Sequence, residues 1–301
     1  MSQIGNYKCL NLRLGEGSFS KVELARHLVL DKEVALKIIR VDKIKDPYVK
    51  KNLQREATIM TQLSHPNIIT LYEVCAYQNF YCLVMEFWPG GSLCNFICQH
   101  ESGLGEDLTR RLFKQILNGV EYIHSRNVVH RDIKLDNILI NKGGDHVVIG
   151  DFGLSNFCYP GKLLETHCGT TEYAAPEIFC KNEKFNEEVD VWSCGVVLYV
   201  MLTGELPFAA KDDEKDLKPL RSRIKAGLTV KHQQRLKELN ISESCRALIY
   251  QILGLGVDVK ARPRLPMIQL SPWCSSVTGS QVPASLSHQH QLQVQGSLII
   301  M

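Results

Sequence analysis

The stretch that decides the fold of this 301-residue chain is His130-Arg131-Asp132-Ile133-Lys134-Leu135-Asp136-Asn137, and it is followed by Asp151-Phe152-Gly153. An aspartate at the tip of a loop, such as Asp132, can orient a hydroxyl group and accept its proton. An asparagine a few residues later and the aspartate of the Asp-Phe-Gly turn can hold Mg²⁺ against the phosphates of ATP. Because Mg²⁺ takes few oxygen ligands from protein and the rest from phosphate and water, Asn137 and Asp151 suit it. The two motifs therefore predict a site for phosphoryl transfer.

A glycine-rich segment near the start of the chain indicates contact with phosphates. It reads Leu14-Gly15-Glu16-Gly17-Ser18-Phe19-Ser20-Lys21-Val22 and lies between two apolar segments. Gly15 and Gly17 have no Cβ, so the backbone could pass close to a phosphate there. On its own, such a pair of glycines is better explained by an ordinary hairpin turn. The prediction therefore depends on the motifs that follow.

A lysine inside an apolar run supplies the next indication. The run Val34-Ala35-Leu36-Lys37-Ile38-Ile39 reads as a strand. A lysine buried there is unfavourable unless it has a partner, and the predicted partner is Glu56 in a helix expected over residues 52–63. The inward face of that helix is predicted from the apolar spacing of Leu53, Ala57, Met60 and Leu63. Taken singly, Lys37 reads better as a side chain that snorkels at a strand edge, and Glu56 as a solvated helix residue. The other motifs beside them favour the ion pair.

Composition limits the remaining classes of function. With 45% hydrophobic residues and a net charge of +3, the chain suits a soluble globular protein, without a dominant role in binding nucleic acid or membrane surfaces. The longest apolar stretch, residues 189–202, is too short to cross a bilayer and predicts a buried helix. The 11 cysteines show no zinc-type spacing, and no signal peptide opens the sequence. We therefore expect reduced cysteines in a cytoplasmic or nuclear protein.

Taken together, these motifs resemble those of eukaryotic protein kinases over residues 7–273. Ala175-Pro176-Glu177, the run from Asp190 to Gly195, and Arg262, which in the family pairs with the glutamate at Glu177, extend the resemblance. It implies an α+β fold of two lobes: a small β-rich lobe with one main helix over residues 7–85, a hinge at 86–91 and a larger, mostly helical lobe at 92–273. Residues 275–301 hold no Asp, Glu, Lys or Arg and are expected to be a disordered tail.

The group within the family is also indicated. Leu154-Ser155-Asn156, Cys168-Gly169-Thr170 and Tyr173-Ala174-Ala175-Pro176-Glu177 resemble the calcium/calmodulin-dependent and AMP-activated group of serine/threonine kinases. The run from Asp46 to Glu56 adds a finer resemblance within that group. Lys134 and Asp136 differ from the tyrosine-kinase pattern and favour Ser/Thr as the acceptor.

The resemblance implies a role for each site residue. Asp132 orients the acceptor hydroxyl, Lys134 neutralises charge on the transferring group, and Asn137 acts with Asp151 in holding Mg²⁺. Lys37 contacts the α- and β-phosphates of ATP and is held by Glu56. The remaining ATP-binding residues are the segment from Leu14 to Val22, the hinge residues Glu86 and Trp88, Met85 at the back of the adenine pocket, and Ala35 and Leu139 in its walls.

Regulation and substrate choice follow from other positions. Thr166 occupies the activation-loop phosphosite of the family, and phosphate there would pair with Arg131, so we expect an upstream activating kinase. Ser20 replaces the third glycine of the phosphate loop, and Thr171 stands where the group usually has proline. Ser92 stands where arginine-directed relatives have a glutamate, which predicts a weaker preference for basic residues near the phosphorylation site. The expected substrates are proteins that offer Ser or Thr hydroxyls.

Two alternatives stay open from the sequence. A nucleotide-binding scaffold without turnover would keep the fold, but Lys37, Asp132, Asn137 and Asp151 are all intact. A phosphotransferase acting on small molecules could share the catalytic loop. The stretch from Thr166 to Glu177 resembles a platform for protein substrates and argues against that second alternative.

Overall fold

The computed structural model describes residues 3–17, 20–40, 55–77, 80–159, 164, 168–180, 185–210, 216–254 and 259–276. In this part of the chain, one compact unit comprises residues up to Ala57 together with Thr70–Phe87, and the other comprises Thr58–Ile69 and Trp88–Ser275. The first is rich in β-structure and the second is mainly helical. The predicted α+β fold with a β-rich and a helical lobe is therefore confirmed.

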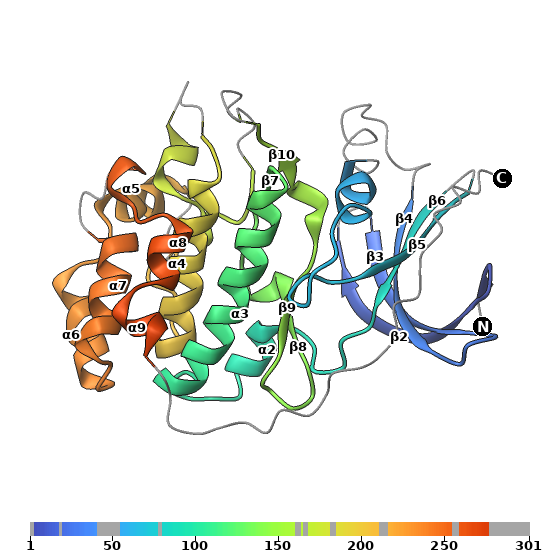
Figure 1. Cartoon of the computed structure of the whole chain (residues 1–301), viewed down its shortest axis with the longest axis horizontal. Coiled ribbons are helices and arrows are strands. Elements are labelled where there is room, and N and C mark those ends of the chain that lie inside the picture. The colour runs from blue at the N-terminus through green and yellow to red at the C-terminus, as the bar shows by residue number, and fades with distance from the viewer. Residues whose placement is uncertain are drawn as a thin grey trace. The chain divides into compact units, whose positions relative to one another are not determined.

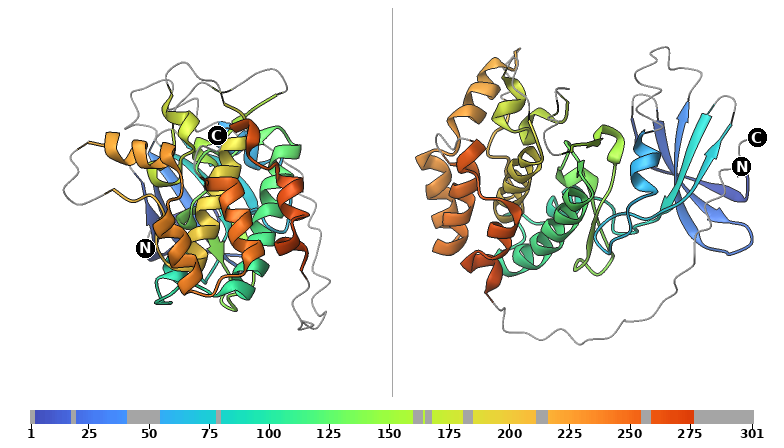
Figure 2. Two further views of the ribbon diagram at one scale, coloured as in Figure 1. Left: turned by 90° about the vertical axis from the view of Figure 1, so that its left-hand side faces the viewer. Right: turned by 45° about the horizontal axis from the view of Figure 1, so that its top comes forward.

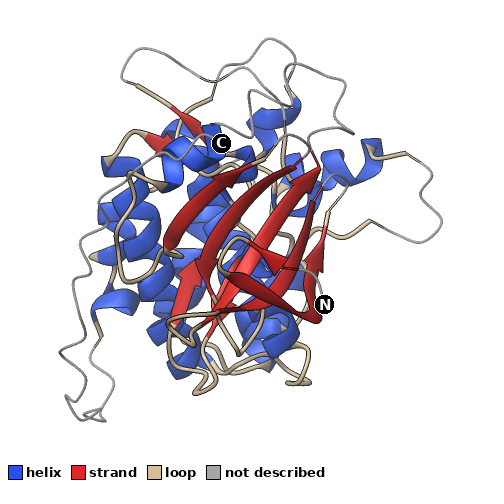
Figure 3. Cartoon of the chain, turned by 90° about the vertical axis from the view of Figure 1, so that its right-hand side faces the viewer, coloured by secondary structure: helices blue, strands red, loops and turns tan. Residues whose placement is uncertain are grey.

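The β-rich unit is built on one antiparallel sheet, drawn in red in Figure 3, with strand order β1-β2-β3-β4-β6-β5. Its core contains Cys9, Ala25, Leu36, Cys82 and Val84, all fully buried. Between its charged and exposed ends, Glu33 and Arg40, β4 is apolar on both faces apart from Lys37. These apolar residues are buried, as expected for a central strand whose two faces are both covered. The strands are β1 (Gln3–Ile4), β2 (Tyr7–Glu16), β3 (Ser20–His27), β4 (Glu33–Arg40), β5 (Leu71–Ala76) and β6 (Phe80–Glu86).

The helix that carries Glu56 is described at residues 55–60. Ala57, Met60 and Leu63 are buried, as their spacing predicts for an inward face. Leu53 and the start of the predicted helix lie outside the described residues. The helical hydrogen bonding ends in a turn, in which the N–H of Leu63 donates to the carbonyl of Met60 at 3.2 Å.

The helical unit is organised around α4 (Glu188–Thr203), in which every residue from Val189 to Thr203 is buried. The apolar run predicted as a core helix is therefore a core helix. It packs against α3 (Glu106–Ser125) and α7 (Glu243–Leu253), as Figures 1 and 2 show. The other helices are α2 (Leu93–Ile97), α5 (Lys218–Ala226), α6 (Val230–Glu238), α8 (Leu265–Gln269) and α9 (Pro272–Ser275).

Short elements in the same unit carry the sequence motifs. Strands β8 (Ile138–Ile140) and β9 (Val147–Ile149) form one antiparallel pair, and β7 (Val128–Val129) and β10 (Asn156–Phe157) form another. The 3₁₀ turns are η2 (Leu135–Asn137), η3 (Phe152–Leu154), η4 (Thr171–Tyr173), η5 (Pro176–Phe179) and η6 (Val259–Ala261). Among the described helices, none combines the length and the apolar character needed to cross a membrane.

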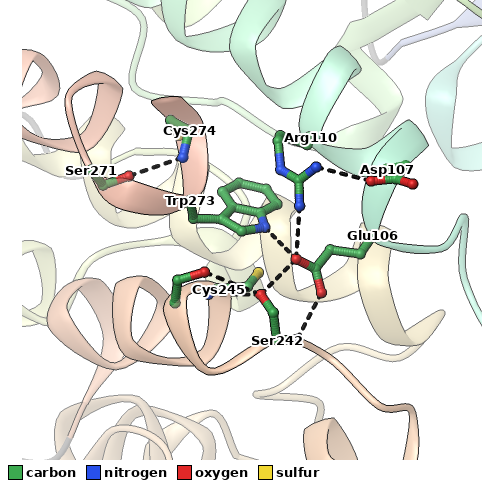
Figure 4. A network of polar contacts seen from close by, with 9 residues as sticks. Glu106, Asp107, Arg110, Ser242, Cys245, Ser271, Trp273 and Cys274 are labelled. Atoms are coloured by element: carbon green, nitrogen blue, oxygen red, sulfur yellow. Dashed lines mark hydrogen bonds and ion pairs between the residues drawn. The ribbon is translucent and has the colours of Figure 1, made fainter. Parts of the chain in front are cut away.

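A polar cluster ties α3, α7 and α9 together (Figure 4). The Glu106 carboxylate accepts hydrogen bonds from the hydroxyl of Ser242 at 2.6 Å, the N–H of Ser242 at 2.7 Å and the indole N–H of Trp273 at 2.7 Å. It also pairs with Arg110 at 2.9 Å. Burial acts to raise the pKa of Glu106, but these hydrogen bonds and the Arg110 charge outweigh it, so the pKa is lowered.

Candidate active site

The carboxylate of Asp132 is the centre of a hydrogen-bonded cluster in the helical unit. Its Oδ1 accepts hydrogen bonds from the N–H and the hydroxyl of Thr170, each at 3.0 Å. Its Oδ2 accepts one from the side-chain amide of Asn137 at 2.9 Å and lies 3.1 Å from the Nζ of Lys134. Lys134 also donates to the Thr170 hydroxyl at 2.7 Å. The structure thus brings together the three proposed catalytic residues and fixes the orientation of Asp132.

The loop that presents Asp132 is anchored by hydrogen bonds to Asp190 of α4. The N–H groups of His130 and Arg131 each donate to the Asp190 carboxylate at 2.8 Å, and the Nε2 of His124 lies 2.8 Å from it. Burial acts to raise the pKa of Asp190, but the hydrogen bonds and the charge of the neighbouring histidines outweigh it, so the pKa is lowered. Arg131 has a left-handed backbone with φ of 67°, which is unfavourable for a residue with a Cβ. The Asp190 contacts therefore stabilise a strained loop beside the reacting position.

Asn137 and Asp151 supply the oxygen atoms proposed for Mg²⁺. The Asn137 Nδ2 donates to the backbone carbonyl and the carboxylate of Asp132, at 2.8 and 2.9 Å. The amide is thereby oriented through its nitrogen, which leaves its oxygen for a cation. The N–H of Gly150 donates to the backbone carbonyl of Asn137 at 2.8 Å, so the residue before Asp151 lies beside Asn137. Asp151 itself has φ of 54°, which turns the chain sharply at this point.

His130 and Phe152 are buried and form a packing contact. Their ring centroids are 4.9 Å apart at an interplanar angle of 64°, and the Nε2 of His130 lies 3.0 Å from the Gly150 carbonyl. The Nδ1 of His130 accepts a hydrogen bond from the N–H of Asp132 at 3.3 Å, so both nitrogens of the imidazole have partners within the protein. This arrangement supports a structural role for His130 in preference to a proton relay.

In the β-rich unit, Lys37 and Glu56 form the ion pair that the sequence predicts. The Lys37 Nζ lies 2.7 Å from the Oε1 of Glu56, and the two side chains are 12% and 3% exposed. Lys37 stands on β4, with Val22 of β3 and Leu83 of β6 as its partners in register. The apolar strands on both sides shield the pair, which strengthens their attraction.

The glycine-rich segment forms the turn between β2 and β3 in the same unit. Leu14, Gly15 and Glu16 end β2, and Ser20, Lys21 and Val22 begin β3. Across the turn, the N–H of Gly17 donates to the carbonyl of Ser20 at 2.8 Å. A Cβ on Gly17 would lie 2.9 Å from the Ser20 hydroxyl oxygen, so the turn is closed tightly around Ser20. The predicted residues Ser18 and Phe19 lie outside the described residues.

The residues proposed for the adenine pocket occur in both units. In the β-rich unit, Ala35 is the register partner of Met85, and both are buried. Glu86 ends β6, and its N–H donates to the carbonyl of Thr70 at 2.9 Å. In the helical unit, Leu139 lies on β8, and the indole of Trp88 stacks on His146 with ring centroids 5.5 Å apart. The Trp88 side chain is therefore packed against protein, and any hydrogen bond to adenine would come from its backbone.

The proposed phosphosite Thr166 lies outside the described residues. Its predicted partner Arg131 is buried, and the Nε of Arg131 donates to the carbonyl of Leu154 at 2.6 Å. The last part of the same segment is described. In this part, Thr170 donates hydrogen bonds to Asp132. Further along, the carboxylate of Glu177 forms a bidentate pair with Arg262 at 2.8 and 3.1 Å.

Two features of the site were missed in the sequence. The anchoring of the catalytic loop by Asp190 was one, although Asp190 belongs to a quoted motif. A charged residue inside an otherwise apolar helix is the signal that could have revealed it, because a buried aspartate needs several donors. The second was the stacking of Trp88 on His146, for which the sequence carries no signal.

The oriented Asp132 carboxylate, the neighbouring Lys134, and the oxygen ligands of Asn137 and Asp151 are suited to phosphoryl transfer. A helical unit with this site, together with a β-rich unit that carries a glycine-rich turn, defines the class of protein kinases. The chain belongs to this class, since the protein kinase domain family matches residues 10–274. Within the family, the chain is similar to the SNF1-related protein kinase catalytic subunit alpha KIN12 of Arabidopsis thaliana, with 38% identity over 273 residues, or 91% of this chain and 52% of the relative.

Other relatives give the same picture. Protein kinase domain-containing protein ppk9 of Schizosaccharomyces pombe is 38% identical over 288 residues, which cover 94% of this chain and 51% of that protein. The SNF-related serine/threonine-protein kinase of Rattus norvegicus is 37% identical over 271 residues, covering 90% of this chain and 35% of that protein. The chain therefore spans about half the length of these relatives or less.

Proposed function

We propose that this chain is an ATP-dependent serine/threonine protein kinase that transfers the γ-phosphoryl group of Mg-ATP to Ser or Thr hydroxyls of proteins. The observation that carries the proposal is the Asp132 carboxylate, held by Thr170, Asn137 and Lys134. A carboxylate fixed in this way can accept a hydrogen bond from a substrate hydroxyl and direct its oxygen for in-line attack. In this reaction, positioning and charge neutralisation supply most of the catalysis.

Lys134 supplies positive charge next to the attacking group. Its Nζ contacts both Asp132 and the Thr170 hydroxyl, so it is held within reach of the transferring phosphoryl group. Charge that develops on the phosphoryl oxygens is then neutralised by a cation that needs little reorganisation. Thr170 acts through these two residues and is a positioning residue.

The donor set of Asn137 and Asp151 fits Mg²⁺. One amide oxygen and one carboxylate are hard ligands, and a cation that keeps water and phosphate ligands needs no more from protein. Bound Mg²⁺ would neutralise the phosphates and polarise the bond to the leaving group. The protein's own contribution is the hydrogen bonding of the Asn137 Nδ2 to Asp132, which directs the amide oxygen away from that carboxylate.

For the nucleotide, we assign phosphate contacts to Lys37 and to the glycine turn. Glu56 holds the Lys37 ammonium at 2.7 Å, so this cation is already oriented before a nucleotide binds. Gly15 and Gly17 provide backbone without side chains at the turn. The adenine ring is assigned to the apolar residues Val22, Ala35, Met85 and Leu139 and to the backbone of residues 86–88.

Serine/threonine specificity is supported by Lys134 and by the relatives. The rat relative is named as a serine/threonine-protein kinase. We further propose the calcium/calmodulin-dependent and AMP-activated group. Within it, the run from Asp46 to Glu56 resembles the hormonally up-regulated Neu-associated kinase, an assignment that rests on the sequence of that run alone.

Substrate preference for basic residues is proposed to be weak. Ser92, which stands at the position of a glutamate in arginine-directed relatives, caps α2 by accepting a hydrogen bond from the N–H of Asn95 at 3.2 Å. Its side chain is neutral and is committed to the helix end. Asp136 remains as an acidic residue that could contact a substrate arginine.

We propose that phosphorylation of Thr166 by an upstream kinase activates the enzyme. Phosphate adds a charge of about −1.5 to −2 and strong acceptors, which suit the Arg131 guanidinium next to Asp132. Thr166→Ala is expected to hold the activity at the level of the unphosphorylated chain, even after treatment with an activating kinase. Full activity of this variant would contradict the proposal.

The function is tested by phosphoryl transfer from labelled ATP in the presence of Mg²⁺. The purified chain is incubated with a Ser/Thr/Tyr peptide library beside Asp132→Asn, and the labelled residues are identified by mass spectrometry. Label on Ser and Thr that is lost in the variant is the expected result. Equal label in both would indicate a contaminating kinase. ATP binding without any transfer, also after Thr166 phosphorylation, would favour the nucleotide-binding scaffold.

A further inference from the structure

A small cavity of the helical unit lies beside the catalytic loop. It has a volume of about 260 Å³ and is lined by residues of the segment after Asp151 and by one residue of α5. Gly169 is part of this lining. A Cβ on Gly169 would lie 2.6 Å from the carbonyl oxygen of Arg131 and 3.7 Å from the Oδ1 of Asp132. A residue next to a Ser or Thr held by Asp132 would therefore reach the cavity.

The cavity has an apolar base and a single cation. Ala174, Ile178 and Phe179 form the apolar part, and Arg221 of α5 is the one charged residue in the described lining. The guanidinium of Arg221 lies 5.1 Å from the centroid of the Phe179 ring. This stacking holds the cation over the cavity. Within the described residues, Arg221 has no acidic partner.

Thr171 adds a second donor to the same lining. Its backbone carbonyl accepts a hydrogen bond from the N–H of Ala174 at 3.2 Å, while its hydroxyl has no partner among the described residues. Proline, which the related group usually has at this position, could offer no hydroxyl. This chain thus places a hydroxyl and a guanidinium together in a space that fits one side chain.

We infer that this cavity selects substrates with an anionic side chain next to the phosphorylated Ser or Thr, and that Arg221 and Thr171 recognise that anion. This inference rests on the proposed function. A carboxylate of Asp or Glu and the phosphate of an already phosphorylated residue share the required chemistry. The nearby acids Glu172 and Asp136 are not part of the lining and would favour cations elsewhere on the substrate.

The contrasting possibility is a cavity that takes an apolar side chain while Arg221 stays in solvent. The two possibilities predict different rankings of peptides that carry Glu, its neutral isostere Gln, or Leu next to the acceptor Ser. Recognition of an anion puts Glu first, whereas an apolar cavity puts Leu first. They also differ in salt dependence, because attraction between exposed charges weakens as the Debye length falls to about 8 Å at physiological ionic strength.

The test uses Ser peptides in which each flanking position carries Glu, phosphoserine, Gln, Leu or Arg. Values of kcat/KM and peptide binding by fluorescence anisotropy are measured for the full chain and for Arg221→Glu, Thr171→Val and Lys225→Glu. Lys225 lies on the same helix and is exposed but is not part of the lining, so its variant controls for helix charge. Thermal unfolding verifies that each variant is folded.

The unmodified chain should prefer Glu over Gln at one flanking position by about twofold to fivefold at low salt, as an exposed ion pair provides. Phosphoserine should exceed Glu if phosphate is the preferred anion, because it carries more charge. Arg221→Glu should reverse the preference toward Arg, Thr171→Val should reduce it, and Lys225→Glu should retain it.

Equal binding and turnover of the Glu and Gln peptides, or a preference that survives Arg221→Glu, would overturn the inference. A preference for Leu would assign the cavity to apolar residues and would overturn it as well. Anion-selective binding that depends on Arg221 but occurs without phosphoryl transfer would uphold the inference and contradict the proposed function. The anisotropy measurement therefore separates the two failures.

Discussion

At Asp132, the two carboxylate oxygens have different partners. Among the described residues, Oδ1 accepts hydrogen bonds from Thr170 only, through its N–H and its hydroxyl, whereas Oδ2 faces Asn137 and Lys134. The Thr170 hydroxyl also accepts the hydrogen bond from Lys134. A single hydroxyl thus connects the residue that orients the acceptor with the residue that neutralises charge.

We therefore expect Thr170→Val to lower kcat by about tenfold to hundredfold, because small misplacements of reacting groups have effects of this size. The KM for ATP should stay unchanged, since Thr170 is not among the residues assigned to the nucleotide. Steady-state kinetics at varied ATP and peptide concentrations separate the two constants. Thr61→Val, which removes an exposed hydroxyl bonded to its own helix, is the matched control. A change in the KM for ATP alone would contradict this role.

The pairing of Lys37 with Glu56 could be predicted from sequence, because a lysine in an apolar strand needs an acid and a helix offers one nearby. The contacts of Asp190 could not. Asp190 accepts hydrogen bonds from N–H groups of a loop some 60 residues away in the sequence. The way that loop folds over the helix decides which N–H groups these are, and the local sequence does not reveal it. The left-handed φ of Arg131 also has no local cause in the sequence, because it follows from that anchoring.

At the level of elements, the predictability of a helix follows from its burial. The apolar run of α4 identified a core helix directly. In α3, Leu112, Ile116 and Val120 recur at helical spacing and are all buried, as expected for the inward face of an amphipathic helix. The segment over residues 209–239 is rich in charged residues and resembles the kinase family only loosely. Its described part nevertheless forms α5 and α6, because Leu220, Ile224 and Leu236 supply enough buried contact to fix each helix.

The cluster around Glu106 joins three helices and gives the helical unit a dependence on pH. Because the folded-state pKa of Glu106 is lowered, its stabilisation is fully present above the ordinary pKa and is lost as the pH falls toward the lowered value. Glu106→Gln should reduce the free energy of unfolding by about 2 kcal/mol at pH 7, since hydrogen bonds to a charged acceptor are removed.

The same variant should lose less stability than the unmodified chain when the pH is lowered from about 5 to about 3, through the ordinary pKa of a glutamate and toward the lowered value. Urea unfolding followed by tryptophan fluorescence at a series of pH values measures both effects. Glu101→Gln, at an exposed position, serves as the control. An equal pH dependence in Glu106→Gln and the unmodified chain would show that Glu106 does not carry this effect.

For the whole molecule, we place the end of the kinase domain at the last helix. Trp273 is buried, donates to Glu106 and lies 6.0 Å from Phe113 by ring centroids. A chain that ends at Ser276 should keep the unfolding midpoint of the full chain. A chain that ends at Leu270 should lose at least about 3 kcal/mol, as large aromatic side chains in cores typically contribute.

Differential scanning calorimetry of the two shortened chains measures this difference. If the chain ending at Leu270 were as stable as the one ending at Ser276, α9 would have no part in the folded domain. If the chain ending at Ser276 were itself destabilised, the uncharged residues 277–301 would contribute to the fold, against the expectation from their composition.

The bond from the Trp273 indole to Glu106 joins positions 167 residues apart. At synthesis rates of about 5–20 residues per second, the ribosome adds the second partner roughly 8–33 s after the first. During that interval, the start of α3 lacks the indole and the Ser242 groups that finally surround its carboxylate. The helical unit can therefore reach its final form only when translation of the domain is nearly complete. Nascent chains in this interval are the form on which chaperones would act.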